Sequence, residues 1–318
     1  MVRALLCAAM ALVALAAAAQ PYPAKAVRIV VPSSPGGASD LVARMVAAPL
    51  AETLGQPFVV ENRVTSGGII GTQQVAESPP DGHTLLVTFD TFASNGLLFR
   101  NLKWDPVRDF APVMQLCRYP QLLLVHPSLG VKSLQDFVAL AKQRGAQLNY
   151  GSAGPASSSR LAYELFKDVA GIETVPVHYK GGGPAIQDLL SGQVQVMLIQ
   201  GGGSLQQHVR TGKLVALAQS SLSPSKFYPE LPTIAATYPG FETESWVAMF
   251  APAATPRPVI ERLHGMLAKL LAEPAIRERF ESQGCDIVGG TPEQLGRVVR
   301  DDQAKWARII EKKKISIE

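Results

Sequence analysis

Short apolar runs and longer stretches of helical periodicity alternate along this chain. The first apolar run, 29–31, ends at Pro32, and after two glycines the apolar positions recur at helical spacing over 41–46. The same order of strand, glycine turn and helix returns several times, with further strands predicted at 58–60, 84–88, 175–179 and 194–199. This alternation predicts an α/β fold built from mostly parallel sheets flanked by helices.

Proline and the apolar pattern set the expected limits of other elements. Pro49 lies inside the first helical pattern, so we expect the helix to kink or stop early there. Two separate apolar strands are expected within 113–125, on either side of residues 118–120. Residues 89–95 are expected to form a loop whose two phenylalanines plug the core.

Length and composition predict a large core, and the N-terminus predicts export. The chain has 318 residues, of which 47% are hydrophobic and 18% charged, which suits two lobes. Arg3, the apolar run 4–18 and the small residues after it predict a secretory signal peptide at 1–19. An uncleaved membrane anchor is the alternative, but the run is short for a span. Cys7 does not fit a lipid attachment site because a bulky leucine precedes it.

The net charge excludes some partners. It is +4 for the whole chain and +3 without Arg3, too small an excess to indicate a nucleic-acid partner. The one basic cluster, 312–314, reads as a solvated C-terminal end. No later run is long and apolar enough to cross a bilayer, so we expect a soluble exported protein.

Two cysteines, Cys117 and Cys285, lie after the signal peptide. An oxidising compartment permits a disulfide between them. They are separated by 168 positions (285 minus 117), and nothing in the sequence brings them together. The sequence therefore leaves their pairing open.

The first glycine turn is a candidate anion site. Ser34, Pro35, Gly36 and Gly37 lie between a strand and a helix whose first turn holds Asp40. Free N–H groups and the positive end of the helix dipole favour an anion there, and the glycines let it approach the backbone. A tight connection with a solvated aspartate explains the pattern equally well.

A second turn of similar design lies near the middle of the chain. Residues 151–160 join a strand to a helix and hold four serines, at positions 152, 157, 158 and 159. Their hydroxyl groups suit carboxylate oxygens, whereas ordinary N-capping needs only one serine. The segment 89–95 follows a parallel strand and should open on the same sheet edge as the first turn.

Motifs for catalysis and cofactors are missing or incomplete. The five histidines have no metal-ligand spacing, and the glycine run 66–71 misses the first glycine of a dinucleotide fingerprint. No nucleophile elbow occurs, and the S-x-x-K match at 223–226 has no companion motifs. We therefore expect no metal, no cofactor and no enzymatic activity.

Several motifs in register resemble one known family. They are the run 30–40, Val60-Glu61-Asn62-Arg63, Gly67-Gly68 with Gly71, 80–86, 109–113, Tyr179-Lys180-Gly181 and 289–293. Together they resemble the extracytoplasmic receptors of tripartite tricarboxylate transporters, the TctC/Bug family, from about Tyr22 to the end of the chain.

The resemblance implies a two-lobed, type II periplasmic-binding-protein-like fold with a cleft between the lobes, closing by a hinge on a small organic acid. The order of the predicted elements gives a first lobe of 20–117 and 245–318 and a second of 118–244. The resemblance implies a periplasmic location and integral membrane transporter subunits as partners; we expect a monomer. A ligand-sensing protein that acts with a signalling receptor is the alternative. The implied ligand contacts are Ser34, Pro35, Gly36, Gly37, Asp40, Thr88 and Thr91 from the first lobe, and Ser152, Ala153, Gly154, Ser157, Ser158 and Gln200 from the second.

Three positions depart from the family pattern. Arg160 replaces a usual histidine, and could pair with a ligand carboxylate or be exposed, the latter being favoured. Ile199 stands where the family usually has an aspartate, and Pro155-Ala156 stiffens the second turn. These departures favour a plain carboxylate or an aromatic acid over an amino acid.

Overall fold

The computed structural model describes residues 22–64, 66–202 and 204–317, with the side chains of Ser66 and Ser204 left out. The predicted signal peptide, 1–19, and its Cys7 lie outside the described residues. Within the described part of the chain, no helix combines the length and the apolar character that crossing a membrane requires.

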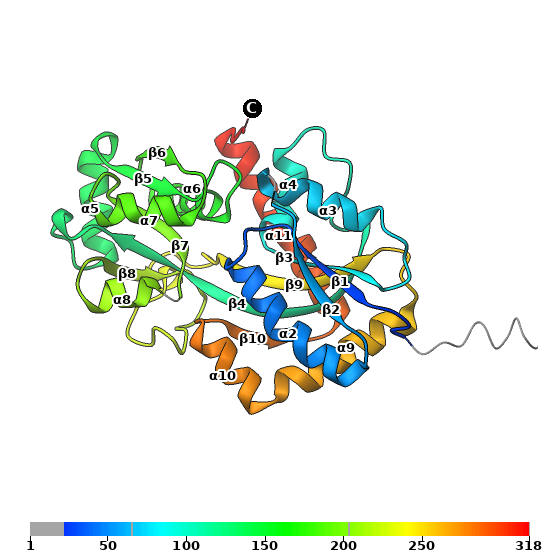
Figure 1. The fold of residues 1–318 in the computed structure, drawn as a ribbon. Helices are drawn as coiled ribbons and strands as arrows, with labels where there is room; N and C mark the ends of the chain where they lie inside the picture. Colours follow the sequence, from blue (N-terminus) through cyan, green and yellow to red (C-terminus); the bar gives the residue numbers. More distant parts are fainter. Residues whose placement is uncertain (1–21, 65, 203, 318) are drawn as a thin grey trace, which may run out of the picture.

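Two groups of strands, joined by one long strand, form the framework. In the first lobe the spatial order is β2 (Phe58–Asn62), β1 (Val27–Val31), β3 (Thr84–Phe89), β9 (Glu244–Pro252) and β4 (Phe110–Val125), and β10 (Asp286–Gly289) also pairs with β4. In the second lobe the spatial order continues from β4 to β7 (Val196–Gln200), β5 (Asn149–Ser152) and β6 (Val175–His178). Strand β8 (Val215–Gln219) also pairs with β4. Figure 1 shows β4 running between the two groups.

Helices cover both groups of strands. The first lobe carries α2 (Ala38–Leu54), α3 (Ile69–Ala76), α4 (Thr91–Leu98), α9 (Arg257–Ala272), α10 (Pro274–Ser282) and α11 (Pro292–Lys313). The second carries α5 (Leu134–Arg144), α6 (Ser158–Ala170), α7 (Gly182–Leu190) and α8 (Ser204–Arg210). Short 3-10 turns lie at η1 (Ser66–Gly68), η2 (Pro127–Leu129), η3 (Gly145–Gln147) and η4 (Ile234–Ala236).

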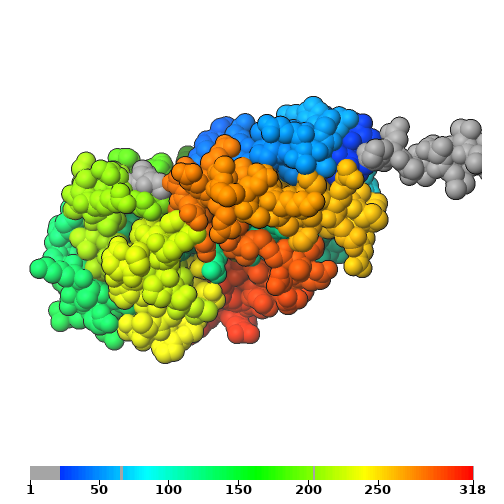
Figure 2. All heavy atoms as spheres, turned by 90° about the horizontal axis from the view of Figure 1, so that it is seen from below, coloured from blue at the N-terminus to red at the C-terminus, as the bar shows by residue number. Residues whose placement is uncertain are grey.

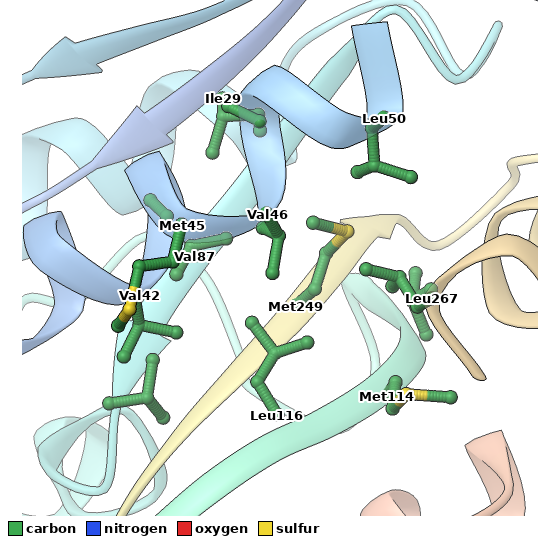
Figure 3. Close-up of a cluster of buried hydrophobic side chains, with 14 of the residues drawn as sticks. Ile29, Val42, Met45, Val46, Leu50, Val87, Met114, Leu116, Met249 and Leu267 are labelled. Atoms are coloured by element: carbon green, nitrogen blue, oxygen red, sulfur yellow. The ribbon is translucent and has the colours of Figure 1, made fainter. Parts of the chain in front are cut away.

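Each lobe has its own hydrophobic core. In Figure 3, Val46 and Leu50 of α2 point toward Met249 of β9 and Leu267 of α9, and all four are buried. A separate cluster in the second lobe includes Phe137, Tyr150 and Phe166. Because burying apolar surface contributes about 25 cal/mol per Å², each lobe is stabilised largely from within. The α/β two-lobed prediction is confirmed.

The direction of strand pairing changes where the lobes join. β1 pairs parallel with β2 and β3, and β5 pairs parallel with β6 and β7. β4 pairs antiparallel with β9 and β7. The predicted parallel arrangement thus holds for β2, β1 and β3 in the first lobe and for β6, β5 and β7 in the second. The other pairings, which involve β4 or β9, are antiparallel. The boundaries 117/118 and 244/245 fall in β4 and at the start of β9; they stay a prediction.

The prediction of two strands within 113–125 was wrong, because β4 is continuous over 16 residues. Arg118, expected to interrupt it, keeps its guanidinium partly exposed and pairs with Glu244 at 3.1 Å and with Asp286 at 3.4 Å. The side chain is satisfied at the surface, so the backbone stays in register with β9 through Pro120.

Helix α2 does not stop at Pro49 but continues to Leu54. Proline removes one backbone hydrogen bond from a helix. Val46 and Leu50, on either side of it, are both buried in the first-lobe core. We infer that their burial offsets the loss.

Residues 89–95 are not a loop, since α4 begins at Thr91. Phe92 is buried against Trp104 and Phe250, as a core plug should be. Its packing, together with buried Ala93, fixes a short helix that its weak sequence pattern did not reveal.

Cys117 and Cys285 form a disulfide, with Cα atoms 5.8 Å apart. The pairing that the sequence left open is decided by strand β10, which lies antiparallel to β4 and places Ile287 opposite Cys117. Both cysteines are fully buried in the first-lobe core.

Candidate functional site

A cavity of about 490 Å³ lies between the lobes. Its wall takes residues from the starts of four helices: Ala38 of α2, Thr91 of α4, Ser158 of α6 and Gly182 of α7. The N–H groups at a helix start lack partners within the helix, and the helix dipole makes that end positive. Two helices from each lobe therefore direct positive potential into one space.

Asp40 stabilises the first-lobe turn, residues 34–37, through hydrogen bonds of its carboxylate. Its carboxylate accepts hydrogen bonds from the Gly36 backbone N–H at 2.8 Å, from Asn62 Nδ2 at 2.9 Å and from Arg44 Nε at 3.0 Å. Burial by itself raises the pKa of Asp40, but Arg44, Gly36 and Asn62 hold it below its ordinary value. Gly36 has a φ of +78°, which favours glycine. The ionised aspartate thus holds the turn in place. No side-chain hydrogen bond caps the start of α2, so the backbone N–H groups of its first turn can donate hydrogen bonds to a ligand.

Serine hydroxyl groups hold the second-lobe turn. Ser157 Oγ accepts from the Arg160 N–H and donates to the Gly154 carbonyl at 2.7 Å. Ser159 Oγ accepts from the Ala153 N–H at 2.9 Å. Ser157 and Ser159 therefore order the turn, whereas the Ser158 hydroxyl interacts with Asp90 of the first lobe, and both residues line the cavity.

The lining residues carry little charge of their own. Among the described residues that line the cavity, none is a lysine, arginine or histidine, and Asp90 is the single carboxylate. Tyr119 also lines the wall, and burial raises the pKa of its hydroxyl well above the ordinary value, so it stays neutral. An anion here would be held by helix starts, hydroxyl groups and amides rather than by a cationic side chain.

Asp90 occupies an unusual environment on this wall. It is 4% exposed, and its Oδ1 has no hydrogen-bond partner among the described residues. Burial raises the pKa of Asp90 to about 7, and the charge of Asp302 adds to the shift. The hydroxyl groups of Ser245 and Ser158 and the Thr91 N–H oppose it. Near neutral pH, Asp90 therefore exchanges a proton.

Comparison with known proteins identifies the family. The model of the tripartite tricarboxylate transporter family receptor, TctC, matches residues 42–315. The chain belongs to this family. The resemblance inferred from the sequence motifs is therefore confirmed.

Solved structures of the TctC/Bug kind share the fold of this TctC chain. Rpa4515 of R. palustris with adipate has a TM-score of 0.83 and 34% identity, covering 93% of this chain and 99% of that one. The periplasmic binding protein BugD has a TM-score of 0.80 and 32% identity, covering 93% and 99%. MatC of Rhodopseudomonas palustris with bound malate has a TM-score of 0.79 and 32% identity, covering 91% and 100%.

The structure divides the site residues expected of this TctC chain into two groups. Those on the cavity wall are Gly36, Thr91, Ala153, Ser157, Ser158 and Gln200. Those not on that wall are Ser34, Pro35, Gly37, Asp40, Thr88, Ser152 and Gly154. Ser34 and Pro35 are exposed, while Asp40, Thr88 and Ser152 are buried. Their roles as ligand contacts stay a prediction.

Sequence reasoning missed more than half of the wall. The missed residues are Ala38, Leu41, Phe89, Asp90, Tyr119, Gly182, Gly183, Ile186, Ile199, Gly201, Gly202, Leu205 and Gln283, whereas Ser159 was one of the four serines that the sequence singled out. For Gly182 and Gly202 a signal existed, since each lies in a glycine turn that follows a predicted strand. Tyr119 and Gln283 carry no local pattern, and folding alone brings them to the cavity.

Two departures from the TctC family pattern can now be placed. Arg160 does not line the cavity: its Nη1 donates to the carbonyl groups of Pro155, at 2.7 Å, and Ser316, at 3.2 Å. It is half-buried rather than exposed, and it ties the second-lobe turn to the C-terminal segment. Ile199 does line the cavity, so an apolar side chain lies on the wall there.

Proposed function

We propose that this TctC-family receptor captures a small organic acid between its lobes and delivers it to a tripartite tricarboxylate-type transporter. The observation that carries the proposal is the convergence of four helix starts, two from each lobe, on one cavity. An anion bound between them gains from both lobes at once, so it favours a closed state over an open one. Rpa4515 with adipate and MatC with malate support an organic acid as the ligand.

We propose that the receptor binds its ligand without chemistry. The described residues that line the cavity include no histidine, lysine or cysteine that could activate or act as a nucleophile. Ser152 Oγ does lie 2.7 Å from His178 Nδ1, but Ser152 is fully buried and does not line the cavity. That pair supports the turn.

The ligand contacts we propose are the predicted residues that line the wall: Gly36, Thr91, Ala153, Ser157, Ser158 and Gln200. Apolar side chains, among them Leu41, Ile186 and Leu205, would pack against the carbon skeleton of the acid. We further propose a periplasmic location after removal of residues 1–19, because the disulfide suits an oxidising compartment.

Isothermal titration calorimetry of the purified receptor with adipate, succinate, malate, citrate and benzoate tests this function. We expect saturable binding of at least one of these acids with a stoichiometry of one. A cooperative unfolding transition would show that the protein used is folded. If none of the five acids binds to that folded protein, the organic-acid proposal is contradicted.

Filling the cavity is expected to remove binding without unfolding the protein. A Cβ atom added at Gly182, which lines the wall, lies 3.4 Å from Ile199 Cδ1, an ordinary contact. We expect Gly182→Leu to weaken binding of the tightest acid at least tenfold, because the larger side chain occupies ligand volume.

Gly265→Leu is the matched control for this variant. Gly265 lies in α9, away from the cavity, and a Cβ atom added there meets nothing within 4 Å. Both variants should keep the melting temperature of the wild-type protein, measured by differential scanning fluorimetry. Equal affinities of the two variants would refute the assigned cavity.

A further inference from the structure

Asp90 lines the cavity with one carboxyl oxygen that lacks a partner among the described residues. It is the residue before α4, but its side chain makes no capping hydrogen bond. It is buried and lines the cavity, and its Oδ1 has no partner among the described residues. Buried carboxyl oxygens normally have hydrogen-bond partners, so this oxygen calls for a group that the ligand-free protein does not supply.

Among the described residues, the groups that act on the pKa of Asp90 include no cation. The one charge among them is the negative charge of Asp302 of α11. Lys305 lies on the same helix, but its Nζ forms an ion pair with Asp302 Oδ1 at 2.7 Å. The remaining neighbours are the hydroxyl groups of Ser245 from β9 and Ser158 from α6, and the Thr91 N–H of α4.

An ionised Asp90 would oppose an anionic ligand. The two like charges would share a small space whose described lining includes no basic side chain, and such repulsion is strong away from bulk water. A neutral Asp90 has the opposite effect, because a carboxylic acid donates an O–H hydrogen bond to an anion, and such bonds are short and strong.

We propose that Asp90 binds the ligand as a neutral carboxylic acid, its O–H donating to a ligand carboxylate, so that capture of the anion takes up a proton from the medium. The inference rests on the proposed function. No covalent bond changes: one proton moves from solvent to an Asp90 oxygen and stays there while the ligand is bound. Because burial and Asp302 raise the pKa of Asp90 to about 7, the proton is available at neutral pH.

The affinity should therefore depend on pH. Above about pH 7 the free receptor loses the Asp90 proton and must regain it on binding, so affinity falls with rising pH. For the tightest of adipate, succinate and malate, we expect the dissociation constant to rise about tenfold between about pH 6 and pH 8. Most of the ligand carboxyl groups are already ionised over this range.

Calorimetry can count the proton directly. Titrations in two buffers of different ionisation enthalpy at pH 8 should give binding enthalpies that differ by the amount expected for uptake of close to one proton. His178, whose pKa burial and Arg160 lower from its ordinary value, is already neutral at that pH.

Two variants separate Asp90 from other causes of pH dependence. Asp90→Asn keeps the size of the side chain and provides an N–H donor without a titrating proton, so its affinity should be nearly constant from pH 6 to pH 8. Asp302→Asn removes the neighbouring negative charge, so the fall in affinity should begin at a lower pH. Asp301→Asn, at an exposed position of α11, is the control and should behave as the wild type.

The outcomes are distinct. Binding with the same affinity at pH 6 and pH 8, or an unchanged pH profile in Asp90→Asn, would overturn the role of Asp90 but leave the proposed function intact. Affinity that rises with pH, and is lost in Asp90→Asn, would show an ionised Asp90 accepting from the ligand and would also overturn it. If none of the acids binds at any pH, the proposed function fails first, and this inference fails with it.

Discussion

Asp90→Asn is expected to stabilise the ligand-free protein at pH 8 by about 2–4 kcal/mol. The wild-type protein buries a carboxyl group whose pKa is raised from 3.8 to about 7, whereas an unfolded chain ionises it freely. Each pKa unit corresponds to about 1.4 kcal/mol, and Asp90 is 4% exposed, so solvent screens little of this cost. In a protein of this size the melting temperature should rise by about 5 °C.

The stabilisation should depend on pH in one direction. Below about pH 4 both the folded and the unfolded chain hold the Asp90 proton, so the substitution gains nothing through this linkage. From there to about pH 7 the unfolded chain alone is ionised, and the wild type loses stability relative to the variant. Chemical denaturation of both proteins at pH 5 and pH 8, with Asp301→Asn as the control, measures the difference. An equal gain at both pH values would contradict the raised pKa.

Removing the disulfide is expected to cost about 3–5 kcal/mol. The bond between Cys117 and Cys285 closes a chain loop with a sequence separation of 168, so it restricts the unfolded chain strongly. In the folded protein it joins β4 to β10 inside the first-lobe core. Urea denaturation of the Cys117→Ala/Cys285→Ala variant under non-reducing conditions measures the loss.

The single variants provide the control for this prediction. Because either substitution breaks the same bond, Cys117→Ala, Cys285→Ala and the double variant should lose most of the same free energy, far from additively. Thiol alkylation of the denatured wild-type protein without reductant should label neither cysteine. Labelling of both, or a double variant as stable as the wild type, would argue against the disulfide.

A charged contact at the underside of the molecule links the lobes near this disulfide. Lys226 of the second lobe lies 2.6 Å from Glu281 of α10 and 3.2 Å from Asp286 of β10. Figure 2 shows the orange segment that holds α10 against the yellow-green surface of the second lobe. The lobes therefore also meet through residues far apart in sequence, which local patterns could not reveal.

Local chemistry explains why the helix starts were predictable. The glycine and serine turns before α2, α6 and α7 follow apolar runs directly, and the residues that terminate a strand and start a helix are neighbours in sequence. Gly36, Ser157 and Ser158 could therefore be placed near a site before any coordinates. The same reasoning named Ser152 and Asp40, which are buried and do not line the cavity; their roles as ligand contacts stay a prediction.

The sequence by itself determined the family, the α/β layers and the strand-to-helix turns, because these depend on periodicity and on residues close together in the chain. The tertiary structure decided the pairing of Cys117 with Cys285, the continuity of β4 and the environment of Asp90. Asp90 shows the reason: its pKa depends on the hydroxyl groups of Ser158 and Ser245 and on the charge of Asp302, which come from three separate elements. Burial and the charge of Asp302, which is far from Asp90 in the sequence, raise the pKa of Asp90, and only the folded chain supplies both.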